Sequence, residues 1–209
     1  MKLSKRFIPQ SDLELRNAEG EPKKISGYGI VYNRKTQIYD DLYEIIRPGA
    51  ARKILEANSD IKCALNHDNR FLFGRTKSGT LQLEENQTGV KYTVTPPDTG
   101  WARDAMVSIE RRDIDGSSFT FGVTSEGEKI TKQKDGSYLR EIFEFARIGE
   151  MGPVTDPAYI TTTAELRSAQ EEYEDLTADV ETHDNEADKI ESMRTLEHKR
   201  RMLDLKSKY

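Results

Sequence analysis

A serine-rich turn and one histidine are the residues of this chain most able to do nucleophilic chemistry. The turn Gly116–Ser118 opens the alternating segment Phe119–Val123, and His67 lies upstream of it. A serine hydroxyl is a weak nucleophile until a neighbouring base takes its proton, so the two groups must be held within hydrogen-bonding reach. The other two histidines, His183 and His198, lie in a charged tail. His67 is therefore the candidate base.

Strand parity distinguishes the two serines of the turn. In an alternating strand, Phe119 and Phe121 share one side with Ser117, while Ser118 and Thr120 share the other. If the aromatic side faces the core, Ser118 faces away from it, toward a surface groove. Ser118 is therefore the candidate nucleophile and Ser117 the alternative. The non-catalytic interpretation is that both serines only hydrogen-bond the backbone of a turn, as serines beside glycine commonly do.

A catalytic histidine also needs a partner on its second ring nitrogen, which fixes its tautomer and orientation. Glu150 stands at the end of the last predicted strand, flanked by glycines, and is the candidate. Asp156, Glu144 and Asp68 are alternatives, as is a histidine–serine dyad with no third group. One His-Asp pair is far short of a metal-ligand set, and the sequence has no Cys/His cluster. Neither a metal nor another cofactor is expected.

Alternation and turn residues predict a β-rich α+β fold that positions these groups. Strands are predicted over residues 25–32, 43–46, 61–65, 81–84, 90–94, 116–123 and 138–148, and helices over 50–57 and from about Gly100. His67 would then stand just past the strand 61–65, on its apolar side with Ile61, Cys63 and Leu65. Many short strands with two helices between them are typical of a β-barrel or a strongly bent sheet.

Composition excludes several classes of protein. The single cysteine, Cys63, rules out an internal disulfide and favours a reducing compartment. Residues 1–7 lack the apolar core of a signal peptide, and no apolar run reaches membrane-spanning length, so neither secretion nor a membrane partner is expected. The net charge of −5 comes without a basic stripe in the folded region, which argues against a nucleic-acid partner.

The chain changes character near residue 165. Residues 1–165 show strand-like alternation and hold nearly all the aromatic residues, so they are predicted to form the folded domain. Residues 166–209 form a tail in which an acidic block precedes a basic one, with a thin apolar stripe that includes Ile190 and Leu203. Such a tail is either a marginal helix that needs a partner or disordered.

Several segments, in order along the chain, together resemble the prohead (procapsid maturation) serine proteases of tailed phages, the HK97-type family. The matching segments are Ser26–Val31, Glu44–Ala50, Leu65–Asp68, Phe73–Thr76, Gly79–Leu81, Asp115–Phe121 and Glu150–Tyr159. The serine segment resembles the family pattern G-x-S-F-x-F, which places the nucleophile at Ser118. Two positions depart from the pattern: Thr120 stands where glycine is frequent, and Asp156 stands where an apolar residue is frequent.

The resemblance implies a closed β-barrel surrounded by a few helices, similar to herpesvirus assemblin. It implies a serine endopeptidase that acts inside the immature capsid, in the bacterial host cytoplasm. Its expected partners are the major capsid protein with its scaffolding region and a scaffold protein, and it usually cleaves itself. A homodimer is compatible with the resemblance. His67, Ser118 and Glu150 would be the catalytic residues, while Arg75 would assist the oxyanion or, as we favour, brace the barrel.

Two features of the chain, its tail and its site residues, leave more than one interpretation of the function. The acidic-then-basic tail resembles a scaffold-contacting arm, and self-cleavage near residues 164–173 would free the enzyme; a solvated tail with no role is the other interpretation. The whole chain could instead be a non-catalytic capsid-assembly scaffolding protein built on the same barrel. The presence of both His67 and Ser118 argues against that, because an inactive copy needs neither.

Overall fold

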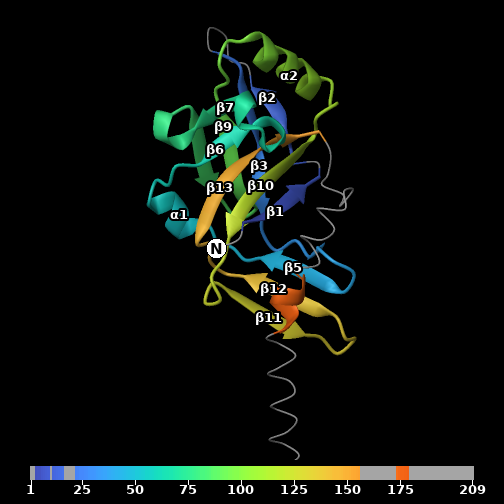
Figure 1. Cartoon of the computed structure of the whole chain (residues 1–209). Coiled ribbons are helices and arrows are strands. Elements are labelled where there is room, and N and C mark those ends of the chain that lie inside the picture. Colours follow the sequence, from blue (N-terminus) through green and yellow to red (C-terminus); the bar gives the residue numbers. More distant parts are fainter. Residues whose placement is uncertain (1–2, 10, 17–21, 156–172, 179–209) are drawn as a thin grey trace, which may run out of the picture.

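The computed structural model describes residues 3–9, 11–16, 22–155 and 173–178. Within these ranges the chain forms thirteen strands in three sheets, with few helices (Figure 1). The predicted β-rich class is confirmed. None of the three strand orders returns on itself through the described pairings, so closure into one barrel stays a prediction.

A five-stranded sheet runs through the middle of the molecule and carries the candidate site. Its order is β1-β10-β13-β6-β7, and its strands are β1 (Ser4–Ile8), β10 (Gly116–Gly122), β13 (Arg147–Val154), β6 (Lys62–Ala64) and β7 (Leu72–Arg75). The central strand β10 is antiparallel to both β1 and β13, whereas β6 runs parallel to β13. Every residue of β10 is buried. The predicted serine strand therefore lies inside the sheet.

Two four-stranded sheets complete the β-structure. The first has the order β2-β3-β9-β8, with β2 (Glu14–Arg16), β3 (Lys24–Val31), β9 (Gly89–Val94) and β8 (Leu81–Glu85). The second has the order β11-β12-β5-β4, with β11 (Glu128–Lys132), β12 (Tyr138–Ile142), β5 (Leu42–Ile46) and β4 (Thr36–Gln37). The predicted hairpin of residues 81–84 and 90–94 is confirmed as the antiparallel pair β8–β9.

The helices lie at the margins of the sheets. Helix α2 (Gly100–Glu110) lies at one end of the molecule and the sheet containing β11 and β12 at the other, while α1 (Arg52–Glu56) flanks β13 (Figure 1). Both predicted helices are present. Three short 3-10 helices follow strands or turns: η1 (Leu65–His67), η2 (Asn69–Phe71) and η3 (Thr76–Ser78).

One described segment of the predicted tail contacts the folded domain. Residues 173–178 are helical, and the Tyr173 ring packs on Tyr39 and Tyr138, with centroid separations of 4.7 and 6.4 Å. Its hydroxyl donates to Asp41 over 3.2 Å. The boundary at residue 165 stays a prediction, since residues 156–172 and 179–209, with the basic block and most of the acidic one, lie outside the described residues.

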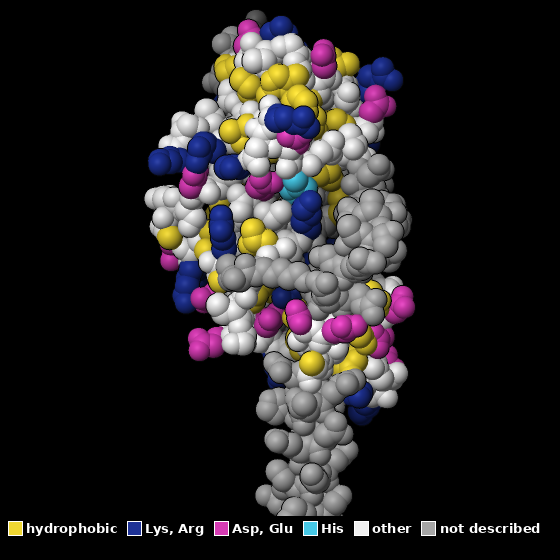
Figure 2. Space-filling model, viewed as in Figure 1, with side chains coloured by type: hydrophobic (Ala, Val, Ile, Leu, Met, Phe, Trp, Pro, Cys, Tyr) yellow, Lys and Arg dark blue, Asp and Glu magenta, His cyan; other side chains and the backbone are white. Residues whose placement is uncertain are grey.

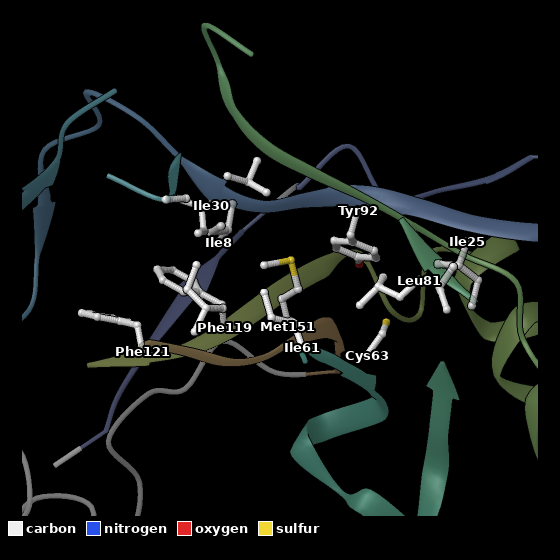
Figure 3. Packing of buried hydrophobic residues seen from close by; sticks show 14 of the residues in the cluster. Ile8, Ile25, Ile30, Ile61, Cys63, Leu81, Tyr92, Phe119, Phe121 and Met151 are labelled. Atoms are coloured by element: carbon white, nitrogen blue, oxygen red, sulfur yellow. The ribbon is translucent and has the colours of Figure 1, made fainter. Parts of the chain in front are cut away.

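The core lies between the five-stranded sheet and the sheet of β3 and β9. Side chains that alternate along these strands meet there, and Figure 3 shows Ile30 and Tyr92 facing Phe119 and Met151. Residues of this kind are fully buried, and each large side chain contributes about 1.5–3 kcal/mol by leaving water. This packing holds β10 rigidly, as a strand that carries candidate site residues must be held.

A buried ion cluster joins β1 to the sheet of β5 and β12. The Glu44 carboxylate, of which 3% is exposed, accepts from Arg6 over 2.8 Å and from Arg140 over 2.9 Å. Arg140 also binds Glu128. Removing one partner of such a buried group typically costs about 3–5 kcal/mol, because the remaining charge is left unpaired. The cluster therefore fixes the position of β1 beside β10.

The predicted strand 138–148 is wrong in extent. The chain leaves the sheet after Ile142 and joins the five-stranded sheet at Arg147, so β12 and β13 belong to different sheets. Between them, the Phe145 amide donates to the Ala50 carbonyl over 2.9 Å. Alternation continues through the change of sheet because both sheets face the same core, which is why the pattern suggests one strand.

Candidate active site

The backbone at His67 is not the strand extension that the sequence predicted. Strand β6 ends at Ala64, and the chain turns through η1, where Asn66 has φ 53° and His67 has φ 60°. Residues other than glycine rarely adopt this left-handed backbone conformation, because it costs them roughly 1 kcal/mol or more. The parity that aligned His67 with Cys63 is therefore wrong. The turn lifts the imidazole off the strand and directs it toward β10.

Asn66 fastens this turn to the end of β13. Its Oδ1 accepts from the Thr155 backbone N–H over 2.9 Å and from the Thr155 hydroxyl over 3.3 Å. Asparagine tolerates the left-handed region better than most residues, so the type at this position suits the turn. Sequence reasoning missed Asn66, although an asparagine directly before the candidate base is itself a turn signal.

Three side chains from separate elements meet in one hydrogen-bonded row. The His67 Nε2 atom lies 2.7 Å from the Ser118 Oγ atom of β10. On the other side of the ring, Nδ1 lies 3.0 Å from Oε2 of Glu150 in β13. Because an ionised carboxylate can only accept, Nδ1 carries the proton and Nε2 is free to accept the hydroxyl proton. The structure thus brings together all three residues selected from the sequence.

The two serines point to opposite sides of β10, as parity predicted. Ser117 is fully buried, and its Oγ lies 2.8 Å from the Tyr92 hydroxyl and 2.7 Å from the Ser11 Oγ. Ser118 bonds His67 on the opposite side of the strand, and only 3% of it is exposed, so the groove that the sequence suggested there stays a prediction.

Glu150 lies in the middle of β13 rather than at the end of the last strand, which corrects the sequence prediction. It stands opposite Thr120, where a register shift between Thr120 and Phe121 interrupts the β10–β13 pair. The Thr120 hydroxyl accepts from the Glu150 backbone N–H over 3.0 Å. Irregularities of this kind commonly re-aim a side chain next to a functional site. Thr120 therefore helps to set the direction of the carboxylate, a role that its type alone does not reveal.

The alternative third residues are engaged elsewhere. Asp68 accepts from the Arg70 guanidinium over 2.6 Å, and Glu144 accepts from Lys53 over 2.7 Å. Asp156 lies outside the described residues. Arg75 forms an ion pair with Asp60, the arrangement expected of the bracing role that we favoured.

Burial and charge set the protonation of His67. Burial lowers the pKa of His67 below its ordinary value of about 6.5. The hydrogen bond that Nδ1 donates to Glu150 opposes this shift, and the nearby Lys5 ammonium reinforces it. Burial disfavours the charged form of Cys63 as well, and for a thiol this raises the pKa. Cys63 is therefore an unreactive core side chain. Because the pKa of His67 is lowered, its imidazole is in the neutral form at neutral pH and can accept a proton.

Close approach between β6 and β13 brings His67 to Ser118, and it depends on Gly152. A Cβ at Gly152 would lie 2.7 Å from the Ala64 carbonyl oxygen and 3.2 Å from the Cys63 Sγ. In Gly152→Ala, β6 and the turn after it must move away from β13. We expect kcat/KM to fall about 100-fold, since a displacement of about 1 Å can cost that much.

Gly100→Ala provides the matched control, because nothing lies within 4 Å of the added Cβ. Peptidase assays and thermal unfolding of both variants make the test. Wild-type activity in Gly152→Ala would show that this contact does not position His67.

The described ranges contain no cluster of three or more His, Cys, Asp or Glu side chains placed to hold a metal ion. None of their helices is both long and apolar enough to cross a bilayer.

A hydroxyl, an imidazole and a carboxylate in this order form the arrangement that serine hydrolases use. The family model described as caudovirus prohead serine protease matches residues 11–176. The chain therefore belongs to this family of peptide hydrolases, and the family resemblance predicted from the sequence is confirmed.

Comparison with individual proteins adds two findings. A search of curated proteins by sequence found no match. Among solved structures, the chain is similar to the capsid assembly protease of bacteriophage T4, with a TM-score of 0.45 and 10% identity, over 73% of this chain and 97% of the T4 chain.

Proposed function

We propose that this protein is a serine endopeptidase in which Ser118 is the nucleophile, His67 the general base and Glu150 the residue that orients His67. The observation that carries the proposal is the continuous row of hydrogen bonds from Ser118 through both ring nitrogens of His67 to Glu150. Family membership supports it, since residues 11–176 match prohead serine proteases.

The proposed mechanism follows from this geometry. Neutral His67 accepts the Ser118 proton as Oγ attacks a peptide carbonyl, and the imidazolium then gives this proton to the leaving amine. Water releases the acyl-enzyme by the same relay. Glu150 holds the Nδ1–H tautomer and stabilises the positive charge that His67 carries between the two transfers. The chemistry needs no cofactor.

The substrates proposed from the family are the major capsid protein with its scaffolding region, a scaffold protein, and the enzyme itself. The reaction would take place inside the procapsid in the bacterial host. Co-expression with the cognate major capsid protein, wild type against Ser118→Ala, followed by intact-mass analysis, tests this directly. We expect shortened capsid protein and shortened enzyme in the wild type only. The assay would then be repeated with purified procapsids. Full-length products from both proteins in both assays would contradict the proposal and favour the scaffolding alternative.

Replacing Glu150 with glutamine tests its role through the pH profile. The glutamine can still accept from Nδ1 but cannot stabilise the imidazolium, so we expect the plateau rate to fall about 10²–10⁴-fold. Glu150 raises the pKa of His67, so its removal lowers that pKa. Because neutral His67 is the active form, the acid limb of kcat/KM moves to lower pH. A limb that stays in place or moves upward would contradict an ion pair between Glu150 and His67.

The tail is proposed to act as a scaffold-contacting arm that draws the protease into the assembling shell. Cleavage near residues 164–173 would then release the enzyme. Packaging of the protease into procapsids, compared between the full chain and a chain that ends after residue 178, measures this. Equal packaging would leave the tail without a recruiting role.

A further inference from the structure

Strand β1 forms one side of the proposed active site. It pairs antiparallel with β10, with Phe7 opposite Ser118 and Lys5 opposite Thr120. Residues directly opposite each other project to the same face of a sheet, so Lys5 and Phe7 lie on the face that carries the Ser118 hydroxyl. Arg6, between them, points to the other face and is held there by Glu44. The anchored strand therefore presents a fixed set of side chains beside the nucleophile.

Apolar groups flank a cation on this face of β1. The Phe7 ring covers Gly116, since a Cβ there would lie 2.3 Å from the ring, and the Leu3 side chain extends toward Gly149. Leu3 is 43% exposed, and Lys5 between these two residues is exposed as well. An exposed apolar side chain on the strand that borders Ser118 suits contact with a peptide substrate.

Lys5 places a positive charge on the face of the sheet that carries Ser118. No ion pair of its ammonium occurs within the part of the chain that the structure describes. The charged groups that act on His67 are Glu150 from β13 and Lys5 from β1, and Lys5 contributes to the lowered pKa of His67. In Figure 2 the cyan histidine, the sole one in the described ranges, lies at the surface with basic side chains beside it.

The spacing between Lys5 and Ser118 corresponds to about two residues of an extended peptide. Lys5 is a diagonal neighbour of Ser118 across the β1–β10 pair, about 7–8 Å away along the sheet. An extended peptide advances about 3.3 Å per residue. A side chain about two residues from the bond attacked by Ser118 can therefore reach the ammonium.

We propose that Lys5 is a specificity-determining residue that binds an acidic side chain of the substrate close to the scissile bond. The inference rests on the proposed serine endopeptidase and names the substrate class of the same site: a peptide with Asp or Glu near the bond to be cut. The substrate carboxylate would form an ion pair with the Lys5 ammonium. Leu3 and Phe7 would contact apolar side chains of the substrate next to it.

Cleavage of a randomised synthetic peptide library, with the products sequenced by mass spectrometry, tests this inference. For the wild type we expect Asp and Glu to be favoured over Asn and Gln about fivefold at one position near the cut, as an exposed ion pair contributes at most about that much. Lys5→Met should lose this preference and Lys5→Glu should favour Lys and Arg. Lys129→Met, an exposed lysine of β11 in another sheet, should cleave like the wild type.

A second readout distinguishes a charge effect from a structural one. Removing the Lys5 cation raises the pKa of His67, so the acid limb of kcat/KM in Lys5→Met should move to higher pH. A wild type without acidic preference, or a preference that survives in Lys5→Met, overturns the inference alone. A wild type that cleaves no more than Ser118→Ala contradicts the endopeptidase as well.

Discussion

Replacing Ser118 with alanine should lower the peptidase rate by about 10⁴–10⁶, with the fold intact. The hydroxyl is the sole group lost, and its contact is the 2.7 Å hydrogen bond to His67 Nε2. Without it, no oxygen is placed between the imidazole and a bound carbonyl. Single-turnover cleavage of capsid protein, with thermal unfolding measured in parallel, separates loss of chemistry from loss of structure.

Ser117→Ala is the matched control, since the same hydroxyl is removed one residue away. Ser117 bonds Tyr92 and Ser11 in the core, so its loss should cost about 1–3 kcal/mol of stability by leaving buried hydroxyls unpaired. The nucleophile remains, and peptidase activity should remain with it. Full activity in Ser118→Ala, with loss in Ser117→Ala, would move the nucleophile to Ser117.

Replacing His67 with asparagine should cause a loss as large as that of Ser118→Ala. Asparagine suits the position because it tolerates the positive φ of 60°, yet its amide cannot take a proton. A base and a nucleophile that act as one unit give effects that do not add, so the double variant should be no slower than either single variant. Rate measurements on the three variants test this. Losses that multiply would show that the two residues act independently.

The sequence pointed to the candidate site residues through their chemistry, and strand parity separated the two serines of β10. The opposite directions of Ser117 and Ser118 follow from the two-residue period of a strand, and the structure confirms them. The hairpin β8–β9 and helix α2 follow from turn residues and periodicity in the same way. Each of these features depends on residues that are near neighbours in the chain.

The remaining features depend on contacts between distant segments. Strand β1 contains two cations and was not predicted, but it is stabilised because Arg6 binds a buried carboxylate from β5. The turn at His67 requires Asn66 to bond Thr155, which lies far along the chain. Lys5 drew no attention in the sequence because its relation to Ser118 arises only from the pairing of β1 with β10.

The most direct test of the central claim is labelling with a fluorophosphonate, which phosphonylates activated serine hydroxyls. The serine oxygen attacks phosphorus, fluoride leaves, and the neighbouring base takes the hydroxyl proton, as in the attack on a peptide carbonyl. The wild type, His67→Asn and Ser118→Ala proteins would be treated alike, and the adduct would be located by peptide mass mapping. The proposed chemistry predicts one adduct, on Ser118, in the wild type and none in either variant. A wild type without an adduct, or one labelled at a different residue, would contradict the assignment of Ser118 as a nucleophile activated by His67.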